Sequence, residues 1–152
     1  RHNRQDAIDV CTRIRAMRPE ATFGADIIAG FPTETDEMFE NTLAIINECD
    51  LTHLHVFPYS ERGDTPAAKM PAVPKQTRRE RAARLRAAGE VRLSKLLKTR
   101  IGKTASVLIE KDNMGRCEQF LQVRLDQDVE TGSLVNCQIS GSDKSQLDAT
   151  VL

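Results

Sequence analysis

Several common signatures are missing from this 152-residue chain. It has no tryptophan, only 4% of its residues are aromatic, and its formal net charge is zero. No apolar run approaches the roughly 20 residues that a membrane-spanning helix needs, and the charged amino terminus does not resemble a secretory signal peptide. With 39% hydrophobic and 29% charged residues, the composition is typical of a globular protein. A cytoplasmic protein without a membrane partner is the default expectation.

Closely spaced cysteines are also absent. Cys11, Cys49, Cys117 and Cys137 stand far apart in the sequence, whereas cysteine-ligated zinc and iron–sulfur sites usually draw on pairs or triplets of nearby cysteines. We therefore predict no metal site in this chain and interpret the cysteines as small buried residues or inert thiols.

Positive charge is concentrated in one segment. Residues 62–103 carry a net charge of +10, while residues 1–61 carry −6 and residues 104–152 carry −4. Such a segment favours contact with phosphates through counterion release. A solvated helical face would have the same composition, so charge alone leaves both interpretations open.

The first half of the chain alternates helix and strand patterns. Helical spacing of apolar residues is found over residues 5–18, a short apolar strand over residues 25–29, then a helix with Thr33 as its N-cap, and a strand over residues 51–59. This order indicates parallel strands joined by helical crossovers. Because two parallel strands need further strands to form a stable sheet, we expect the missing ones upstream of Arg1.

The second half has a different texture. Three prolines punctuate the connector before a long basic helix, which is predicted over residues 75–100. Four short alternating runs follow it, separated by turn residues: TASVLIE, QFLQVRLD, SLVNCQIS and LDATVL. Such runs are typical of a small antiparallel barrel or sandwich. We place a domain boundary near Arg100.

Both predicted strands of the first half end in polar loops that contain glycine or proline. In β/α enzymes the loops at the carboxyl ends of parallel strands carry the ligand groups. Ile28 can present an apolar wall to a ring, and Gly30 permits close approach of the backbone. His53 and His55 would share one strand face, but no third ligand is near, so we favour packing over a metal pair.

The two strand-and-loop segments, DIIAGFPTET and HLHVFPYSERGDTPAAKMP, resemble a known family. They are similar to the last two strands of the radical S-adenosylmethionine barrel in tRNA methylthiotransferases, and most similar to the branch that modifies N6-threonylcarbamoyladenosine beside the anticodon. Asp64 stands where the family's Gly-Thr-Pro-Ala signature has its glycine. The initial RHNRQDAI resembles the end of a motif that follows the fourth barrel strand.

The resemblance extends over nearly the whole chain and implies its fold class. Residues 1–74 would form an α/β part of the radical S-adenosylmethionine (β/α) barrel, and residues 75–100 a basic linker helix. Residues 101–152 resemble the TRAM module, a small all-β, OB-like barrel that binds tRNA.

The resemblance also implies a function. The chain would be the C-terminal portion of a transferase that adds a methylthio group to threonylcarbamoyladenosine, and we expect it to be inactive alone, without catalytic residues of its own. Iron–sulfur clusters would be held elsewhere in the enzyme. The expected partial S-adenosylmethionine site comprises Ile28, Gly30, Phe57 and Tyr59. Contacts with the tRNA partner are expected from Arg78, Arg79, Arg81, Lys103 and Arg124.

Two alternatives remain open at the level of the sequence. The chain can belong to a related methylthiotransferase that acts on isopentenyladenosine in tRNA or on a ribosomal protein. Alternatively, it can be an RNA-binding module without catalysis. The sequence indicates no oligomeric state.

Overall fold

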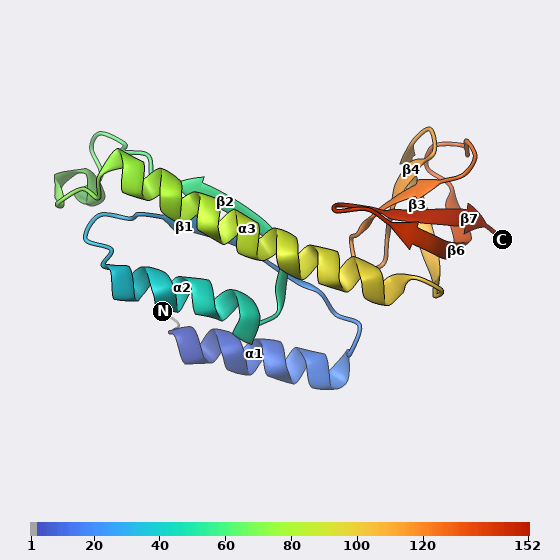
Figure 1. Cartoon of the computed structure of the whole chain (residues 1–152), viewed down its shortest axis with the longest axis horizontal. Helices are drawn as coiled ribbons and strands as arrows, with labels where there is room; N and C mark the ends of the chain where they lie inside the picture. The colour runs from blue at the N-terminus through green and yellow to red at the C-terminus, as the bar shows by residue number, and fades with distance from the viewer. Residues whose placement is uncertain (1–2) are drawn as a thin grey trace. The chain divides into compact units, whose positions relative to one another are not determined.

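The computed structural model describes residues 3–152. The chain divides into two compact units, Arg1–Arg92 and Leu93–Leu152 (Figure 1). None of the helices among the described residues combines the length and the apolar character that a membrane crossing requires.

The first unit contains a two-stranded parallel sheet with helices around it. Its elements confirm the predicted order of helix, strand, helix and strand, and they are α1 (Arg4–Met17), β1 (Phe23–Ala29), α2 (Asp36–Glu48) and β2 (Leu51–Pro58), followed by a short 3-10 helix η1 (Pro66–Lys69) and by α3 (Lys75–Arg100). The two strands pair so that Ile28 lies opposite Phe57.

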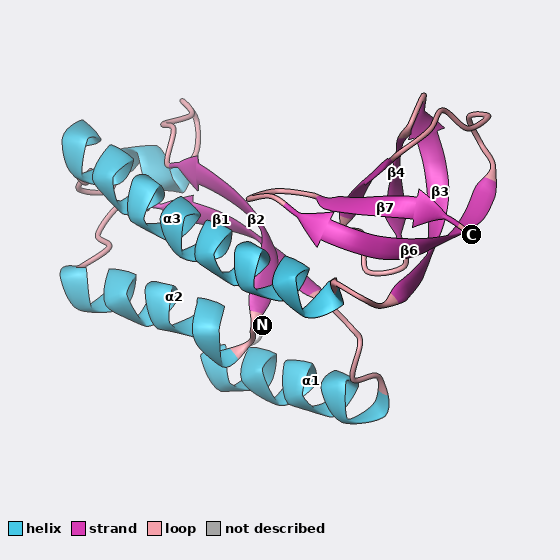
Figure 2. Ribbon diagram, turned by 45° about the vertical axis from the view of Figure 1, so that its right-hand side comes forward, coloured by secondary structure: helices cyan, strands magenta, loops and turns pink. Residues whose placement is uncertain are grey.

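Helices cover only one face of this sheet (Figure 2). Ile27 and Ala29 of β1 point into a core with Phe39 and Ile46 of α2 and with Leu85 of α3. The alternate strand residues are exposed: Asp26 and Ile28 on β1, His55 and Phe57 on β2. The alternation expected from the sequence is therefore present, and one set of side chains is left uncovered.

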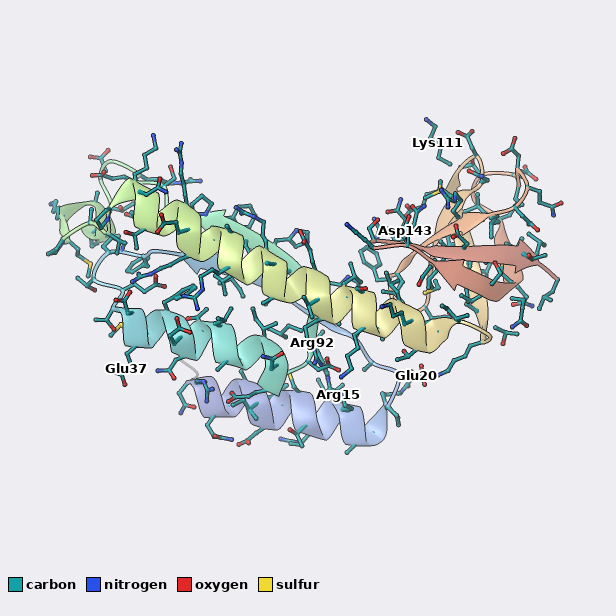
Figure 3. The ribbon with its side chains drawn as sticks, in the orientation of Figure 1. Arg15, Glu20, Glu37, Arg92, Lys111 and Asp143 are labelled. Atoms are coloured by element: carbon teal, nitrogen blue, oxygen red, sulfur yellow. The ribbon has the colours of Figure 1, made fainter. Side chains whose placement is uncertain are left out.

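An ion cluster stands at the carboxyl end of α2, where the chain turns into β2. Asp50 has a left-handed backbone with φ 52°, and its carboxylate pairs with Arg92 of α3 and with Arg15 of α1, the latter at 3.8 Å. Figure 3 shows both arginines beside this turn. Arg15 also donates to the Cys49 carbonyl at 3.1 Å, which satisfies one of the unpaired carbonyls at the helix end.

The start of α2 corrects one prediction. The N-cap is Thr35, whose hydroxyl accepts from the backbone N–H of Met38 at 3.2 Å. Thr33 was expected in that role but has a φ of 70°, and an N-cap residue has an extended backbone. Its N–H donates to the Pro71 carbonyl at 3.1 Å, so Thr33 belongs to the loop that precedes the helix.

The left-handed backbone of Thr33 leads to a prediction for the stability of the first unit. Replacing Thr33 with glycine should raise the free energy of unfolding by about 1 kcal/mol, because a left-handed conformation is strained for an L-residue. The Thr33 side chain is exposed, so little packing is lost. The midpoint of urea unfolding measures the effect. As a matched comparison, Asp64→Gly at φ 65° should give a smaller gain, since aspartate tolerates this region. An equal or reversed order would contradict the strain argument.

The basic helix α3 has the bounds predicted from the sequence, Lys75–Arg100. The second unit contains its last two turns and a closed barrel with strand order β3-β4-β5-β7-β6. The strands are β3 (Thr104–Lys111), β4 (Met114–Cys117), β5 (Gln122–Leu125), β6 (Leu134–Ser142) and β7 (Leu147–Val151). The sequence indicated four runs and missed β4. A closed five-stranded barrel is consistent with a TRAM-like module.

Three of the four cysteines are buried, and Cys11 is half-buried. Burial first, and then the neighbouring Cys11 thiol and the Glu48 carboxylate, raises the pKa of the Cys49 thiol to about 11, although Arg15 acts in the opposite direction. Burial also raises the pKa of Cys137, which lies in the barrel core. Cys49 and Cys137 are therefore protonated at neutral pH, and the burial of three of the four cysteines agrees with the small buried residues that the sequence indicated.

Candidate functional site

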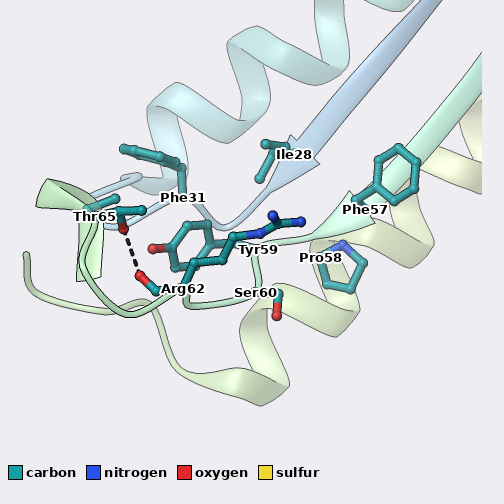
Figure 4. A pocket seen from close by; sticks show the side chains of 9 residues that line it. Ile28, Phe31, Phe57, Pro58, Tyr59, Ser60, Arg62 and Thr65 are labelled. Atoms are coloured by element: carbon teal, nitrogen blue, oxygen red, sulfur yellow. Dashed lines mark hydrogen bonds between the residues drawn. The ribbon is translucent and has the colours of Figure 1, made fainter.

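A pocket of about 500 Å³ lies where the two strands end. Carboxyl ends of β1 and β2 and the amino end of α3 gather at this end of the first unit (Figure 1). The pocket is lined by Ile28, Phe31, Phe57, Pro58, Tyr59, Ser60, Arg62, Thr65 and Ala67 (Figure 4). Three of the four residues predicted to bind the cofactor, Ile28, Phe57 and Tyr59, are thus brought together.

The exposed apolar side chains of the sheet form one wall of this pocket. Ile28 is 52% and Phe57 54% exposed, and they are neighbours across the parallel pair. Such exposure of large apolar side chains at a concave site is typical of a surface that covers a ligand ring or a further protein element.

Backbone and side-chain contacts fix Tyr59 at the mouth of the second strand. Its N–H donates to the Ala29 carbonyl at 2.8 Å, and its carbonyl accepts from Arg78 at 2.7 Å. Phe31 packs edge-on against the ring with centroids 5.4 Å apart. The Tyr59 hydroxyl is buried and finds no hydrogen-bond partner within residues 3–152, so it is available to a polar group of a ligand.

Gly30 has a different role from the one that the sequence indicated. Its φ is 73°, and a Cβ atom there would lie 2.3 Å from Cγ of Arg78. The space that the glycine leaves is therefore filled by the stem of Arg78. Gly30 is not among the residues that line the pocket, and its position serves the packing of α3 against the strand end.

A buried ion network behind the pocket holds the loop between β1 and α2. Arg81 is 6% exposed, and its guanidinium donates to the Glu34 and Asp36 carboxylates, each at 2.6 Å. Glu34 also accepts from the N–H of Gly30 at 2.9 Å. Burial disfavours the charged guanidinium, but the hydrogen bonds that it donates to the Asp36 and Glu34 carboxylates outweigh this effect and raise the pKa of Arg81.

The predicted RNA-binding arginines of α3 thus separate into two kinds. Arg81 is committed to Glu34 and Asp36 and presents no charge to a phosphate in this structure. Arg78 is half-buried and Arg79 exposed. Both line a second pocket of about 380 Å³, together with Pro58, Tyr59, Ser60, Glu61 and Lys75. Three cations face one carboxylate there, and Tyr59 and Ser60 belong to both pockets.

The loop that closes the first pocket turns at Gly63 and Asp64. Asp64 has φ 65°, and the Thr65 hydroxyl donates to the Arg62 carbonyl at 2.9 Å (Figure 4). Aspartate is one of the few residues that tolerate the left-handed region. The tight turn therefore forms without the glycine that the resemblance led us to expect at this position.

The two predicted cations of the barrel also differ. Lys103 is exposed between α3 and β3. Arg124 on β5 is engaged by Asp148 of β7, to which its Nε and Nη2 donate at 2.9 and 2.7 Å. This pair lowers the net positive charge that Arg124 offers to a phosphate.

Comparison with known proteins finds relatives that match the chain over most or all of its length. It is 47% identical over all 152 residues to threonylcarbamoyladenosine tRNA methylthiotransferase MtaB of Rickettsia prowazekii, of which it covers 36%. Over its whole length this chain is similar to one part of a tRNA methylthiotransferase. It is also 29% identical to the MtaB enzyme of Aquifex aeolicus over 88% of its length, and 38% identical over 78% of its length to tRNA-2-methylthio-N(6)-dimethylallyladenosine synthase of Bacillus pumilus. No family model matches the chain.

The chain spans about a third of the two MtaB relatives and about a quarter of the Bacillus pumilus one. Sequence reasoning identified this resemblance and predicted Ile28, Phe57 and Tyr59, three of the nine residues that line the first pocket. It missed Phe31, which is 43% exposed, and the network around Arg81. Phe31 stands between a glycine and a proline, so no helix or strand pattern indicates which way its side chain points. Glu34 and Arg81 are 47 residues apart, and no local pattern links them.

Proposed function

We propose that this chain forms the C-terminal portion of a tRNA methylthiotransferase that acts on N6-threonylcarbamoyladenosine. The observation that carries the proposal is the 47% identity to the Rickettsia prowazekii enzyme of that name, which extends over every part of the chain. Methylthiotransferases that act on dimethylallyladenosine are also related, at up to 38% identity among the relatives named above, and they form the second candidate.

The geometry of the first unit supports a part of a (β/α) barrel. Parallel sheets are normally covered on both faces and extended by further strands. Here β1 and β2 pair only with each other among the described residues, and helices cover one face alone. The bare face, with Ile28 and Phe57, would be the interior of the barrel, and further strands would pair with the open edges.

The residues at the strand ends fit part of an S-adenosylmethionine site. Ile28 and Phe57 offer an apolar wall to an adenine ring, and the buried Tyr59 hydroxyl offers a hydrogen bond that none of residues 3–152 takes up. S-adenosylmethionine and iron–sulfur clusters would supply the radical and the sulfur chemistry. No cluster is proposed to bind in this chain, whose own residues would bind and orient the adenosyl group.

The second pocket would take a phosphate of the bound tRNA. Lys75, Arg78 and Arg79 lie at the amino end of α3, where the helix dipole adds positive potential. This pocket shares Tyr59 and Ser60 with the proposed adenosyl pocket. A phosphate held there would bring the RNA backbone close to the reacting centre. Lys103 and Arg124 of the barrel would add weaker phosphate contacts.

An exchange of segments tests the proposed function. The 152 residues would replace the matching segment of the Rickettsia prowazekii enzyme, and tRNA nucleosides from a bacterium that lacks the modification would be analysed by mass spectrometry. We expect methylthiolated threonylcarbamoyladenosine. Phe57→Asp should lower its yield at least tenfold, because a carboxylate would face the adenine. The matched control is Val10→Asp on α1, which changes a residue of similar exposure, 49% against 54%, and should retain the yield.

Two results would contradict the proposal. A methylthio group on dimethylallyladenosine would support the second candidate. A stable, cluster-loaded exchange protein that modifies neither nucleoside would remove the catalytic role and leave RNA binding as the function of the chain.

A further inference from the structure

Phe120 is the only aromatic residue of the second unit, and it is not part of the barrel core. The side chains that fill this core are aliphatic or cysteine, whereas Phe120 is 63% exposed. Leu134 and Leu152 of the same unit are exposed to a similar extent, so exposure alone does not assign a role to the ring.

The backbone of Phe120 is strained. It closes the three-residue turn between β4 and β5 with φ 61°, and the turn is defined by bonds from the N–H of Phe120 to the Cys117 carbonyl at 2.9 Å and from the N–H of Cys117 to the Leu121 carbonyl at 3.1 Å. Glycine or asparagine is the residue that this position normally holds. A bulky side chain with positive φ is an outlier that points to a function.

Arg116 holds the ring in place. Its guanidinium lies over the ring at 4.3 Å from the centroid, donates to the Phe120 carbonyl at 3.1 Å and pairs with the Glu110 carboxylate at 3.2 Å. The ring is therefore pre-oriented on one side by a side chain that is itself fixed, while most of the residue stays exposed. A rigid aromatic surface loses little entropy when a flat ligand stacks on it.

Local charges disfavour a phosphate at this place. Glu110 neutralises Arg116, Glu118 stands in the same turn, and residues 104–152 carry a net charge of −4. An acidic barrel gains little from counterion release. Stacking on an aromatic ring is the contact with RNA that does not depend on charge, and unpaired bases provide the flat partner.

We propose that Phe120, backed by Arg116, is a stacking platform for an unpaired base of the bound RNA. This inference rests on the proposed tRNA role of the chain and adds a residue that selects for unpaired nucleotides. It assigns base contact to the β4–β5 turn and phosphate contact to the pocket at the start of α3.

The assignment of base contact to Phe120 and phosphate contact to the start of α3 can be tested by titration. The full chain would be titrated with fluorescently labelled unfractionated tRNA at several salt concentrations. Phe120→Asn should weaken binding about five- to a hundredfold at every salt concentration, the range found for loss of one stacked base. Because asparagine tolerates positive φ, the melting temperature should not fall. Arg79→Gln is the matched charge variant and should instead reduce the logarithmic salt slope by roughly 0.7 to 0.9.

Tryptophan provides a second readout, since the chain has none. Phe120→Trp should retain tRNA affinity, and its fluorescence should be quenched on binding, whereas Leu152→Trp, at a barrel residue that is 72% exposed, should not be quenched. Unchanged affinity in Phe120→Asn, or equal quenching at both positions, would overturn the inference while leaving the RNA role intact. A parallel fall in melting temperature and affinity would make Phe120 a structural residue. Failure of the unsubstituted chain to bind tRNA would overturn both proposals.

Discussion

Replacing Arg81 with methionine should destabilise the first unit by about 3 to 5 kcal/mol, enough to unfold a domain of ordinary stability. The change removes the partner of Glu34, whose side chain is only 10% exposed, and a buried carboxylate without a counter-charge is costly. It also removes the hydrogen bond that Arg81 donates to the Glu34 carbonyl at 3.0 Å, which holds the β1–α2 loop against α3. Urea unfolding followed by circular dichroism measures the loss.

Arg84 provides a matched control on the same helix. Both arginines lie over the Phe39 ring, at 5.4 Å for Arg81 and 4.8 Å for Arg84. The carboxylate partner of Arg84 is Glu40, and both side chains of that pair are more than half exposed. Arg84→Met should therefore cost about 1 kcal/mol or less. Similar losses for the two variants would show that contact with Phe39, and not the buried ion pair, is the source of the stability.

A double variant separates the buried charge from the packing. Arg81→Met combined with Glu34→Met leaves no uncompensated charge, and similar apolar replacements of buried pairs are often neutral or stabilising. We expect the double variant to be more stable than Arg81→Met alone. The Gly30 N–H would lose its acceptor in the double variant, which limits the recovery.

The burial of Arg81 illustrates what the sequence conceals. In a run that includes Arg78, Arg79 and Arg84, any one arginine has the same local composition as the others, and a basic run usually forms a solvated face. The partner that buries Arg81 lies on another element, and only the packing of α3 against the β1–α2 loop brings the two together. Charge density therefore predicts a region of contact with phosphate but not its members.

Local signals account for the elements that were predicted well. Proline precedes α3, and the bounds of the helix match the prediction because charged and aliphatic helix formers dominate its sequence as far as Arg100. Gly89 interrupts this run, and it lies where the helix packs closely on the Leu54 side chain. Strand β4, with the sequence MGRC, was missed because four residues with a central glycine show neither alternation nor β-branched side chains. Thr33 and Thr35 are equivalent as N-cap candidates until the backbone angle of each is known.

Topology explains why the first pocket was accessible to sequence reasoning. Carboxyl ends of neighbouring parallel strands meet at one edge, so Ile28 and Phe57 could be placed together from the helix, strand, helix, strand order alone. The contact of Phe31 with Tyr59 depends on the path of a loop. Gly30 was assigned to a ligand because a glycine at a strand end usually permits close approach, but the approaching group is Arg78.

The last turns of α3 should decide whether the barrel folds alone. Leu97 is fully buried in the barrel core, and Leu93 and Leu96 pack against it. A polypeptide of residues 93–152 should therefore unfold cooperatively, whereas one of residues 101–152 should lose about 3 kcal/mol or more, because burying a single leucine contributes about 1.5 to 3 kcal/mol. Thermal and urea unfolding of both pieces, each with intact β3 to β7, measure the difference.

Two substitutions in the whole chain connect this result to a single side chain. Leu97→Ala should cost about 2 to 5 kcal/mol in the unfolding of the barrel, while Val91→Ala, at an earlier position of the same helix that is 68% exposed, should cost little. If residues 101–152 proved as stable as residues 93–152, the helix would only cover the barrel, and the boundary near Arg100 predicted from the sequence would be the one that separates the folding units. If the longer piece is the stable one, one helix contributes to two sites. Arg78 and Arg79 at its start line a pocket of the first unit, and Leu97 near its end belongs to the core of the barrel. A change in the register of α3 would then alter both the pocket that Arg78 and Arg79 line and the barrel.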